Sequence, residues 1–214
     1  MKRVFGVFEA VFDVLYLCAA LVIGLLLLFA GKGEARFLAG LMALTLMLGD
    51  SFHLVPRVNA ILTMREGALL SALGRGKQIA SISMTVFYVF LYHVGLLLFP
   101  QAGGALTYAV YALAAVRIAL CLFKQNAWEE RYPPVSWGVW RNIPFFLLGL
   151  IVSALFLMNA ALAGGLKLMW LAVLLSFAFY LPVVLWVNKN PRLGMLMLPK
   201  TLAYIWMLLM CLTL

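Results

Sequence analysis

The sequence predicts an all-α integral membrane protein, a polytopic bundle of about seven transmembrane helices with a cytoplasmic N-terminus. Of its 214 residues, 66% are hydrophobic and 11% are charged, and the mean hydropathy is +1.09. Soluble domains carry about 25% charged residues. Because a helix needs about 20 apolar residues to cross a hydrocarbon core, seven such helices take up most of this length. We therefore expect a single transmembrane domain over residues 1–214.

Apolar runs bounded by glycine, proline or charge mark the expected helices. These runs lie near residues 11–30, 37–55, 79–99, 105–123, 143–163, 166–187 and 195–214. The first run follows Lys2-Arg3 and is similar to a signal sequence, but no convincing small-residue cleavage site accompanies it. We interpret it as a retained first helix.

The distribution of Lys and Arg predicts the orientation, because cytoplasmic loops are enriched in these residues. Three lie on one side of the expected membrane: Lys32, Arg36 and Lys167. Twelve lie on the other side: Lys2, Arg3, Arg57, Arg65, Arg75, Lys77, Lys124, Arg131, Arg141, Lys189, Arg192 and Lys200. We therefore expect the N-terminus in the cytoplasm, the C-terminus outside, and a location in a bacterial inner (cell) membrane.

Two connections are longer than a tight turn. Residues 56–78 interleave leucine and isoleucine with charged residues, which is typical of an amphipathic helix on the cytoplasmic interface. Residues 124–142 carry Trp128, Tyr132, Trp137 and Trp140 among charges and prolines. Such an aromatic group indicates an anchor at the level of the lipid headgroups.

Composition also limits the partners and cofactors. The net charge of +9 is spread over the connections between apolar runs, so we interpret it as a topology signal and expect no nucleic acid. Membrane lipids and a lipid-like or small-molecule substrate are the expected partners, and the oligomeric state stays open. Single cysteines in three separate runs predict neither a disulfide framework nor a zinc site. With only two histidines, the chain lacks the ligands of a three-histidine zinc hydrolase, and we expect no metal and no cofactor.

Ionisable side chains within membrane helices indicate where function resides, because each costs roughly 2.5 to 3.5 kcal/mol on insertion scales. Asp50 and His53 are three residues apart and are expected on one face of the second helix. Since successive helices alternate in direction, Asp13, Arg117 and Lys200 fall at a similar depth. We expect these residues to form an inward-facing polar chamber near the cytoplasmic leaflet.

Further polar residues accompany this chamber. The third helix carries a stripe that would line it: Ser81, Thr85, Tyr88 and Tyr92, at spacings of four, three and four. Ser51, next to Asp50, is another candidate for contacting a ligand. His93 and Asn159 lie toward the outer leaflet and are expected to be separate.

Each candidate also has a structural interpretation. Asp50 could form an ion pair with Arg117 or Lys200, because buried charges in membranes normally pair. Asp13 lies one turn into its helix and could cap the helix start, where a carboxylate suits the dipole. Lys200 could reach the interface with its long side chain. The tyrosine stripe could simply be helix packing.

The segment from Phe37 to Arg57, in which Gly49-Asp50 and Pro56-Arg57 close an apolar helix, resembles the YhhN-type lysoplasmalogenase family. The helix ending Phe90-Leu91-Tyr92-His93 is similar to the helix that follows in those proteins, and the likeness covers about a quarter of the chain. Members are multi-helix membrane enzymes that cleave the vinyl ether bond of lysoplasmalogens. The resemblance therefore implies a hydrolase of lipid metabolism with Asp50 as its acid. Because no Asp or Glu follows Glu130, a second carboxylate would be Asp13.

Two functions of different classes follow. The first is a membrane-embedded hydrolase of a lysolipid-like vinyl ether, with Asp50, His53 and Asp13 as catalytic residues and, contacting the substrate, Arg117, Lys200, Tyr88, Ser51 and Thr85. The second is a small seven-helix transporter or ligand-binding protein, in which Asp50, His53 and Arg117 carry a proton or bind an anionic solute. An assembly partner with no site of its own is a third possibility.

Overall fold

The computed structural model describes residues 2–64 and 66–214, and within these residues every long element is an α-helix. The seven helices are α1 (Lys2–Phe29), α2 (Glu34–Thr63), α3 (Leu70–Leu98), α4 (Ala105–Leu122), α5 (Val135–Met158), α6 (Met169–Trp186) and α7 (Met197–Cys211). Short 3-10 turns lie in the connections. All seven helices are long and apolar enough to cross a membrane. The expected all-α, multi-pass membrane bundle is confirmed.

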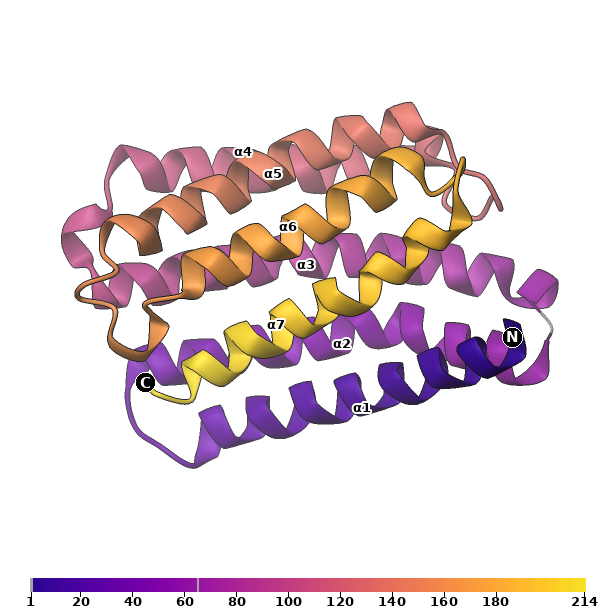
Figure 1. The fold of residues 1–214 in the computed structure, drawn as a ribbon. Helices are drawn as coiled ribbons and strands as arrows, with labels where there is room; N and C mark the ends of the chain where they lie inside the picture. Colours follow the sequence, from indigo (N-terminus) through magenta and orange to yellow (C-terminus); the bar gives the residue numbers. More distant parts are fainter. Residues whose placement is uncertain (1, 65) are drawn as a thin grey trace.

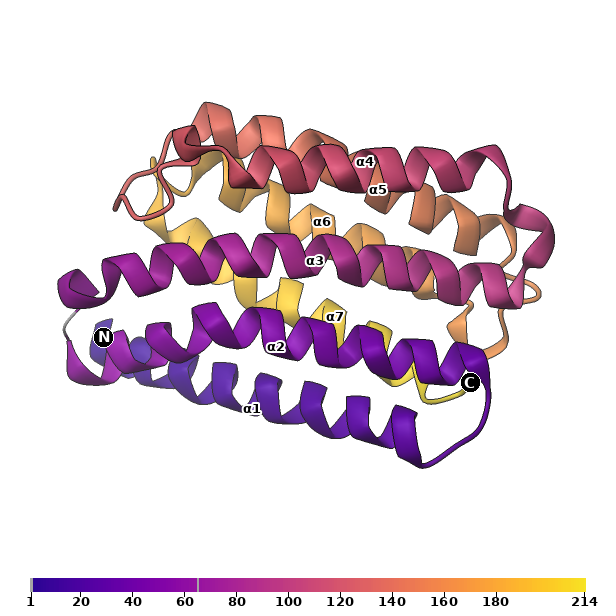
Figure 2. The same cartoon turned by 180° about the vertical axis from the view of Figure 1, so that it is seen from behind.

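The helices run lengthwise in one bundle, and the two chain ends lie at opposite ends of it (Figures 1 and 2). Each helix packs on its neighbour in sequence, and α7 returns to pack on α1, so the bundle closes into a ring. The most extensive packing joins α2 to α3 and α1 to α2. We name the end at which α1 begins the N-terminal end. The α2–α3, α4–α5 and α6–α7 connections also lie there (Figure 1).

The expected interfacial helix over residues 56–78 is wrong. Helix α2 continues through Pro56 to Thr63, a 3-10 turn follows at Glu66–Leu69, and α3 begins at Leu70. The helices continue past their apolar runs because they still pack on each other: Ala60 and Leu73 are buried, and Gly76 lies against the backbone of His53. The charges in this segment therefore belong to the ends of two transmembrane helices.

Part of the expected aromatic anchor is also helical. Helix α5 begins at Val135, directly after Pro133-Pro134. The expected start near residue 143 left out the first two turns of this helix. Trp137 and Trp140 lie in those first turns, and Trp140 is exposed on the outside. Proline sets the start of the helix because it tolerates the first positions and interrupts what precedes them.

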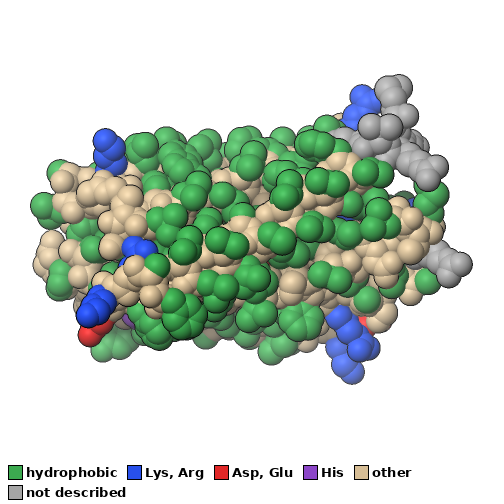
Figure 3. Space-filling model, turned by 90° about the horizontal axis from the view of Figure 1, so that it is seen from below, with side chains coloured by type: hydrophobic (Ala, Val, Ile, Leu, Met, Phe, Trp, Pro, Cys, Tyr) green, Lys and Arg blue, Asp and Glu red, His purple; other side chains and the backbone are tan. Residues whose placement is uncertain are grey.

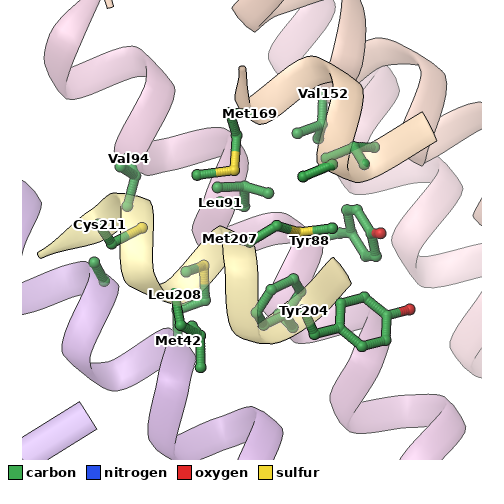
Figure 4. Close-up of a cluster of buried hydrophobic side chains, with 14 of the residues drawn as sticks. Met42, Tyr88, Leu91, Val94, Val152, Met169, Tyr204, Met207, Leu208 and Cys211 are labelled. Atoms are coloured by element: carbon green, nitrogen blue, oxygen red, sulfur yellow. The ribbon is translucent and has the colours of Figure 1, made fainter. Parts of the chain in front are cut away.

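The outside of the bundle is apolar over its middle, as expected for a protein whose solvent is lipid. Figure 3 shows a broad hydrophobic middle with Lys and Arg gathered at the two ends. Inside, the half of the bundle nearer the C-terminus is filled by apolar side chains that pack where α2, α3, α5, α6 and α7 meet (Figure 4). Met42, Leu91 and Met207 are fully buried there.

Close packing of α2 on α3 depends on Gly76. A Cβ at this position would lie 2.7 Å from His53 Cα, and the obstacle is backbone. We expect Gly76→Ala to separate the two helices and to lower the free energy of unfolding by about 1 to 3 kcal/mol, as overpacking does. Thermal unfolding of the purified protein in detergent measures the effect. Gly67→Ala is the matched control, because a Cβ at Gly67 meets no atom within 4 Å. Equal melting temperatures for the two variants would contradict the close approach.

Candidate functional site

Polar side chains from all seven helices meet inside the half of the bundle nearer the N-terminal end. They are linked by hydrogen bonds and by contacts between cations and aromatic rings. We call this group the polar cluster: Tyr16, Asp50, Thr85, Tyr88, Arg117, Asn142, Ser176, Tyr180, Lys200 and Tyr204. The structure thus brings together five residues that the sequence singled out, namely Asp50, Thr85, Tyr88, Arg117 and Lys200.

Asp50 is the acidic residue of the cluster. The Tyr16 hydroxyl of α1 donates a hydrogen bond to Asp50 Oδ2 over 2.7 Å, and Tyr16 itself is buried. On its other side, Asp50 interacts electrostatically with Lys200 of α7, although the two do not form an ion pair within 4.0 Å. The carboxylate therefore points into the bundle, where one hydroxyl holds it and one cation faces it.

Lys200 lies in the first turn of α7 and is turned inward. Its Nζ is 4.9 Å from the centre of the Tyr180 ring and 5.1 Å from that of the Tyr204 ring. Such contacts stabilise a cation electrostatically without neutralising it. The positive charge therefore still acts on the nearby Asp50 carboxylate.

Arg117 is 1% exposed and is held by neutral groups. Its Nε donates to Thr85 Oγ1 over 2.9 Å, and its Nη1 donates to the Arg141 carbonyl and to Asn142 Oδ1, each over 2.9 Å. The guanidinium lies 3.6 Å from the centre of the Phe145 ring. The alternative of an Asp50–Arg117 ion pair does not describe this arrangement, since each side chain has other partners. Arg117 ties α3, α4 and α5 together.

Tyrosines and one asparagine connect the cluster. The Tyr180 hydroxyl donates to Asn142 Oδ1 over 3.1 Å, so this oxygen accepts from both Tyr180 and Arg117. Tyr88 and Ser176 share a buried hydrogen bond of 2.9 Å. Of the expected polar stripe on α3, Thr85 and Tyr88 belong to the cluster, whereas Ser81 donates to the carbonyl of Lys77 within its own helix.

His53 is not part of the cluster. Three residues turn a helix by about 300°, so His53 is offset by about 60° from Asp50 around α2. His53 faces α3, where it lines a small cavity with Leu73 and Lys77, while Asp50 faces α1 and α7. Ser51 donates to the carbonyl of Leu48 and contributes only to its own helix. Asp50 and His53 therefore do not share one ligand position.

Asp13 lies beside the cluster on α1. It is 6% exposed, and its Oδ2 has no hydrogen-bond partner among the described residues. Its charged neighbours are Glu9, Arg57 and Asp50. Glu9 forms an ion pair with Arg57, with Arg57 Nε donating to Glu9 Oε1 over 2.6 Å. Asp13 is thus a second buried carboxylate near Asp50 with an unused acceptor.

The remaining candidates lie in the other half of the bundle. Tyr111 and His93 Nε2 are 2.8 Å apart, while His93 Nδ1 is 2.8 Å from the carbonyl of Val89. Tyr92 bonds to Thr107, and Asn159 donates to the carbonyl of Leu155 at the end of α5. His93 and Asn159 are separate from the cluster, as expected. The expectation that Tyr92 lines the chamber is wrong, because its hydroxyl bonds to Thr107 in the other half of the bundle.

Sequence reasoning missed five members of the cluster: Tyr16, Asn142, Ser176, Tyr180 and Tyr204. Tyr16 follows Asp13 by three residues, a spacing that predicts one face of α1. Asn142 stands in an apolar stretch next to Arg141, where a buried amide needs partners. The spacing of Tyr16 and the apolar surroundings of Asn142 could have predicted these two residues. Tyr180 and Tyr204 have no such signal, because tyrosine is common in helix packing.

No protein-family model matches this chain, and no curated protein or solved structure is significantly similar to it. Within the described residues, no group of three or more His, Cys, Asp or Glu side chains is placed to hold a metal ion. The geometry of the polar cluster is therefore the basis for a functional proposal.

The three helices joined by Arg117 give a test of its role. Arg117→Lys keeps the charge but loses the planar fork that reaches several acceptors at once. Because interhelical hydrogen bonds in membranes contribute about 0.6 to 1.7 kcal/mol each, we expect a loss of about 1 to 3 kcal/mol in stability. Thermal unfolding in detergent would detect it, with exposed Arg192→Lys as the control. An unchanged melting temperature for Arg117→Lys would exclude the bridging role.

Proposed function

We propose that this protein is a membrane-embedded hydrolase that cleaves the vinyl ether bond of a lysolipid-like substrate, with Asp50 as its general acid. One observation carries the proposal: the inward carboxylate of Asp50 is held by Tyr16 and faces Lys200 within a polar cluster. The resemblance of the segment around Gly49-Asp50 to the YhhN-type lysoplasmalogenases points to the same substrate class.

Hydrolysis of a vinyl ether begins with proton transfer to carbon. A protonated Asp50 gives its proton to the double-bond carbon remote from the ether oxygen, and the other vinyl carbon becomes an oxocarbenium ion. Water adds to that cation and loses a proton to a second carboxylate, which returns the proton to Asp50. The resulting hemiacetal then breaks its carbon–oxygen bond to release an aldehyde and an alcohol. One water is consumed, and no oxidant or reductant takes part.

Neighbouring residues have distinct roles in this proposal. The Tyr16 hydroxyl orients the Asp50 carboxyl, and Lys200 stabilises the carboxylate that remains after proton transfer. Asp13 supplies the second carboxylate, whose unpartnered Oδ2 accepts the proton of the attacking water. Arg117 is occupied by three acceptors, so its role is to position the cluster rather than to bind the substrate.

An apolar core lies on one side of the polar cluster. Beyond Lys200 and Tyr204, the next inward residues of α7 are Met207 and Leu208, which pack on apolar residues of α2 and α3 (Figure 4). This apolar core separates the cluster from the C-terminal end. A transporter would need polar groups through that region, whereas an enzyme or a binding site needs only one entrance.

The same proposal includes an orientation. Twelve Lys and Arg against three favour an N-terminal end that faces the cytoplasm. The polar cluster then lies in the cytoplasmic half of the membrane. A substrate would reach it from the inner leaflet.

Aldehyde release tests the enzyme. The purified protein is offered a 1-alkenyl lysophospholipid and, separately, its 1-acyl analogue, and we expect aldehyde from the alkenyl lipid alone. Asp50→Asn should lower the rate by about 100-fold or more, the usual contribution of a general acid. Tyr16→Phe should lower it less, because the carboxyl stays but loses its orientation.

Glu34→Gln is the matched control, since it also converts a carboxylate to an amide but lies exposed at the start of α2. It should retain full activity. A rate unchanged by Asp50→Asn would remove Asp50 from the mechanism. If the wild-type protein releases no aldehyde, the hydrolase proposal fails.

A second candidate function is the binding of a small anionic solute. It is favoured by Lys200, whose charge is held by two rings and faces the interior, and by Arg117, whose partners are all neutral. A bound anion would balance these charges. Release of no aldehyde by the wild-type protein, together with saturable uptake or binding of an anion, would favour this function.

A further inference from the structure

The connection between α6 and α7 carries positive charge that no neighbouring carboxylate balances. Lys189 and Arg192 lie in this connection, at the N-terminal end of the bundle, and both are exposed (Figure 1). No Asp or Glu follows Glu130 in the sequence, so α5, α6 and α7 supply no side-chain carboxylate. Neither Lys189 nor Arg192 forms an ion pair with any residue that the structure describes.

Carboxylates from other segments do not fill this role either. Those that the structure describes at the N-terminal end already have cationic neighbours: Glu9 has Arg57, Glu129 has Arg75, and Glu130 has Arg131. Asp50 lies inside the bundle and faces Lys200. The α6–α7 connection therefore presents two unbalanced cations to its surroundings.

The halves of α6 and α7 that adjoin this connection are only partly covered by the rest of the bundle. The buried residues of α6 end at Phe177, and those of α7 begin at Ala203. None of the residues from 178 to 190 or from 192 to 202 is buried. Since these two half-helices consist mainly of apolar residues, they offer an apolar surface directly beside the two cations.

An aromatic residue places the connection at the boundary of the membrane. Trp186 is the last residue of α6 and is 48% exposed. Tryptophan favours the level of the lipid headgroups, where its ring meets both acyl chains and water. Lys189 and Arg192 follow Trp186 closely in the chain, so their charges lie at this level too. Anionic headgroups lie there and attract basic residues.

We propose that the α6–α7 connection binds the phosphate of an anionic membrane phospholipid. Lys189 and Arg192 contact the phosphate oxygens through charge-assisted hydrogen bonds, and the acyl chains lie on the adjoining half-helices. A zwitterionic headgroup binds less well, because it brings a cation of its own to the two basic residues. The proposal concerns binding alone and does not rest on the hydrolase activity.

Thermal unfolding of the purified protein in dodecyl maltoside tests the site, because a ligand that binds only the folded state raises the melting temperature. The probes are dioleoyl phosphatidylglycerol, dioleoyl phosphatidylcholine and inorganic phosphate. We expect phosphatidylglycerol to raise the melting temperature more than phosphatidylcholine does, and inorganic phosphate to leave it unchanged. An equal rise with the two lipids would overturn the proposal, as would a rise with inorganic phosphate that equals the rise with phosphatidylglycerol.

Two double substitutions with the same change in net charge then locate the site. Lys189→Gln with Arg192→Gln should weaken phosphatidylglycerol binding roughly thirtyfold, since each basic residue near an anionic lipid surface contributes about fivefold. Lys32→Gln with Lys167→Gln removes two exposed cations from the opposite end and should leave the affinity unchanged.

Because all four substituted residues are exposed, both double variants should fold as the wild-type protein does. An equal loss of affinity in the two double variants, or no loss in the variant of the α6–α7 connection, would contradict the proposal. The diacyl probes contain no vinyl ether, so the outcome is independent of the proposed hydrolysis.

Discussion

The constraint on which this structure depends is that the hydrocarbon core of a membrane offers no water to polar groups. Every polar side chain within the helices must therefore find its partners inside the bundle. Arg117 shows how completely this is achieved, since Thr85, Asn142, a backbone carbonyl and the face of Phe145 surround its guanidinium. The need to satisfy this one group fixes how α3, α4 and α5 lie against each other.

The same constraint sets the register of α1 against α2. Glu9 pairs with Arg57, and Tyr16 pairs with Asp50, so the two helices form polar contacts two turns apart along one antiparallel seam. Asp13 lies between these contacts on α1, turned around the helix by about 40° from Glu9 and about 60° from Tyr16. Asp13 is buried there, but its Oδ2 has no hydrogen-bond partner among the described residues. An unsatisfied carboxylate at such a place is the kind of group that catalysis uses and that stability alone would not retain.

Much of the fold could be predicted because it follows from composition. Apolar runs locate all seven helices, and alternating directions place Asp50, Arg117 and Lys200 in the same half of the bundle. The ends of α2 and α3 could not be placed from the sequence, because their charged residues pair with other parts of the bundle. Arg57 of α2 pairs with Glu9 of α1, and Arg75 of α3 pairs with Glu129.

The composition of the site was harder to predict for a related reason. Asp50 and Lys200 are visible as charges in apolar sequence, but the groups that hold them are neutral. Tyr16 and Tyr180 differ in no local way from tyrosines that only fill space. Which ones point inward depends on the rotation of each helix, and a residue only 60° away, such as His53, faces a different neighbour.

Helix α2 carries both Asp50 and His53, which lie in different surroundings. Asp50 faces α1 and α7, whereas His53, less than one turn further, faces the cavity beside α3. Tyr16 holds one flank of α2, and the close backbone approach at Gly76 holds the other. These contacts fix the rotation of α2, so Asp50 and His53 keep separate surroundings although they lie less than one turn apart.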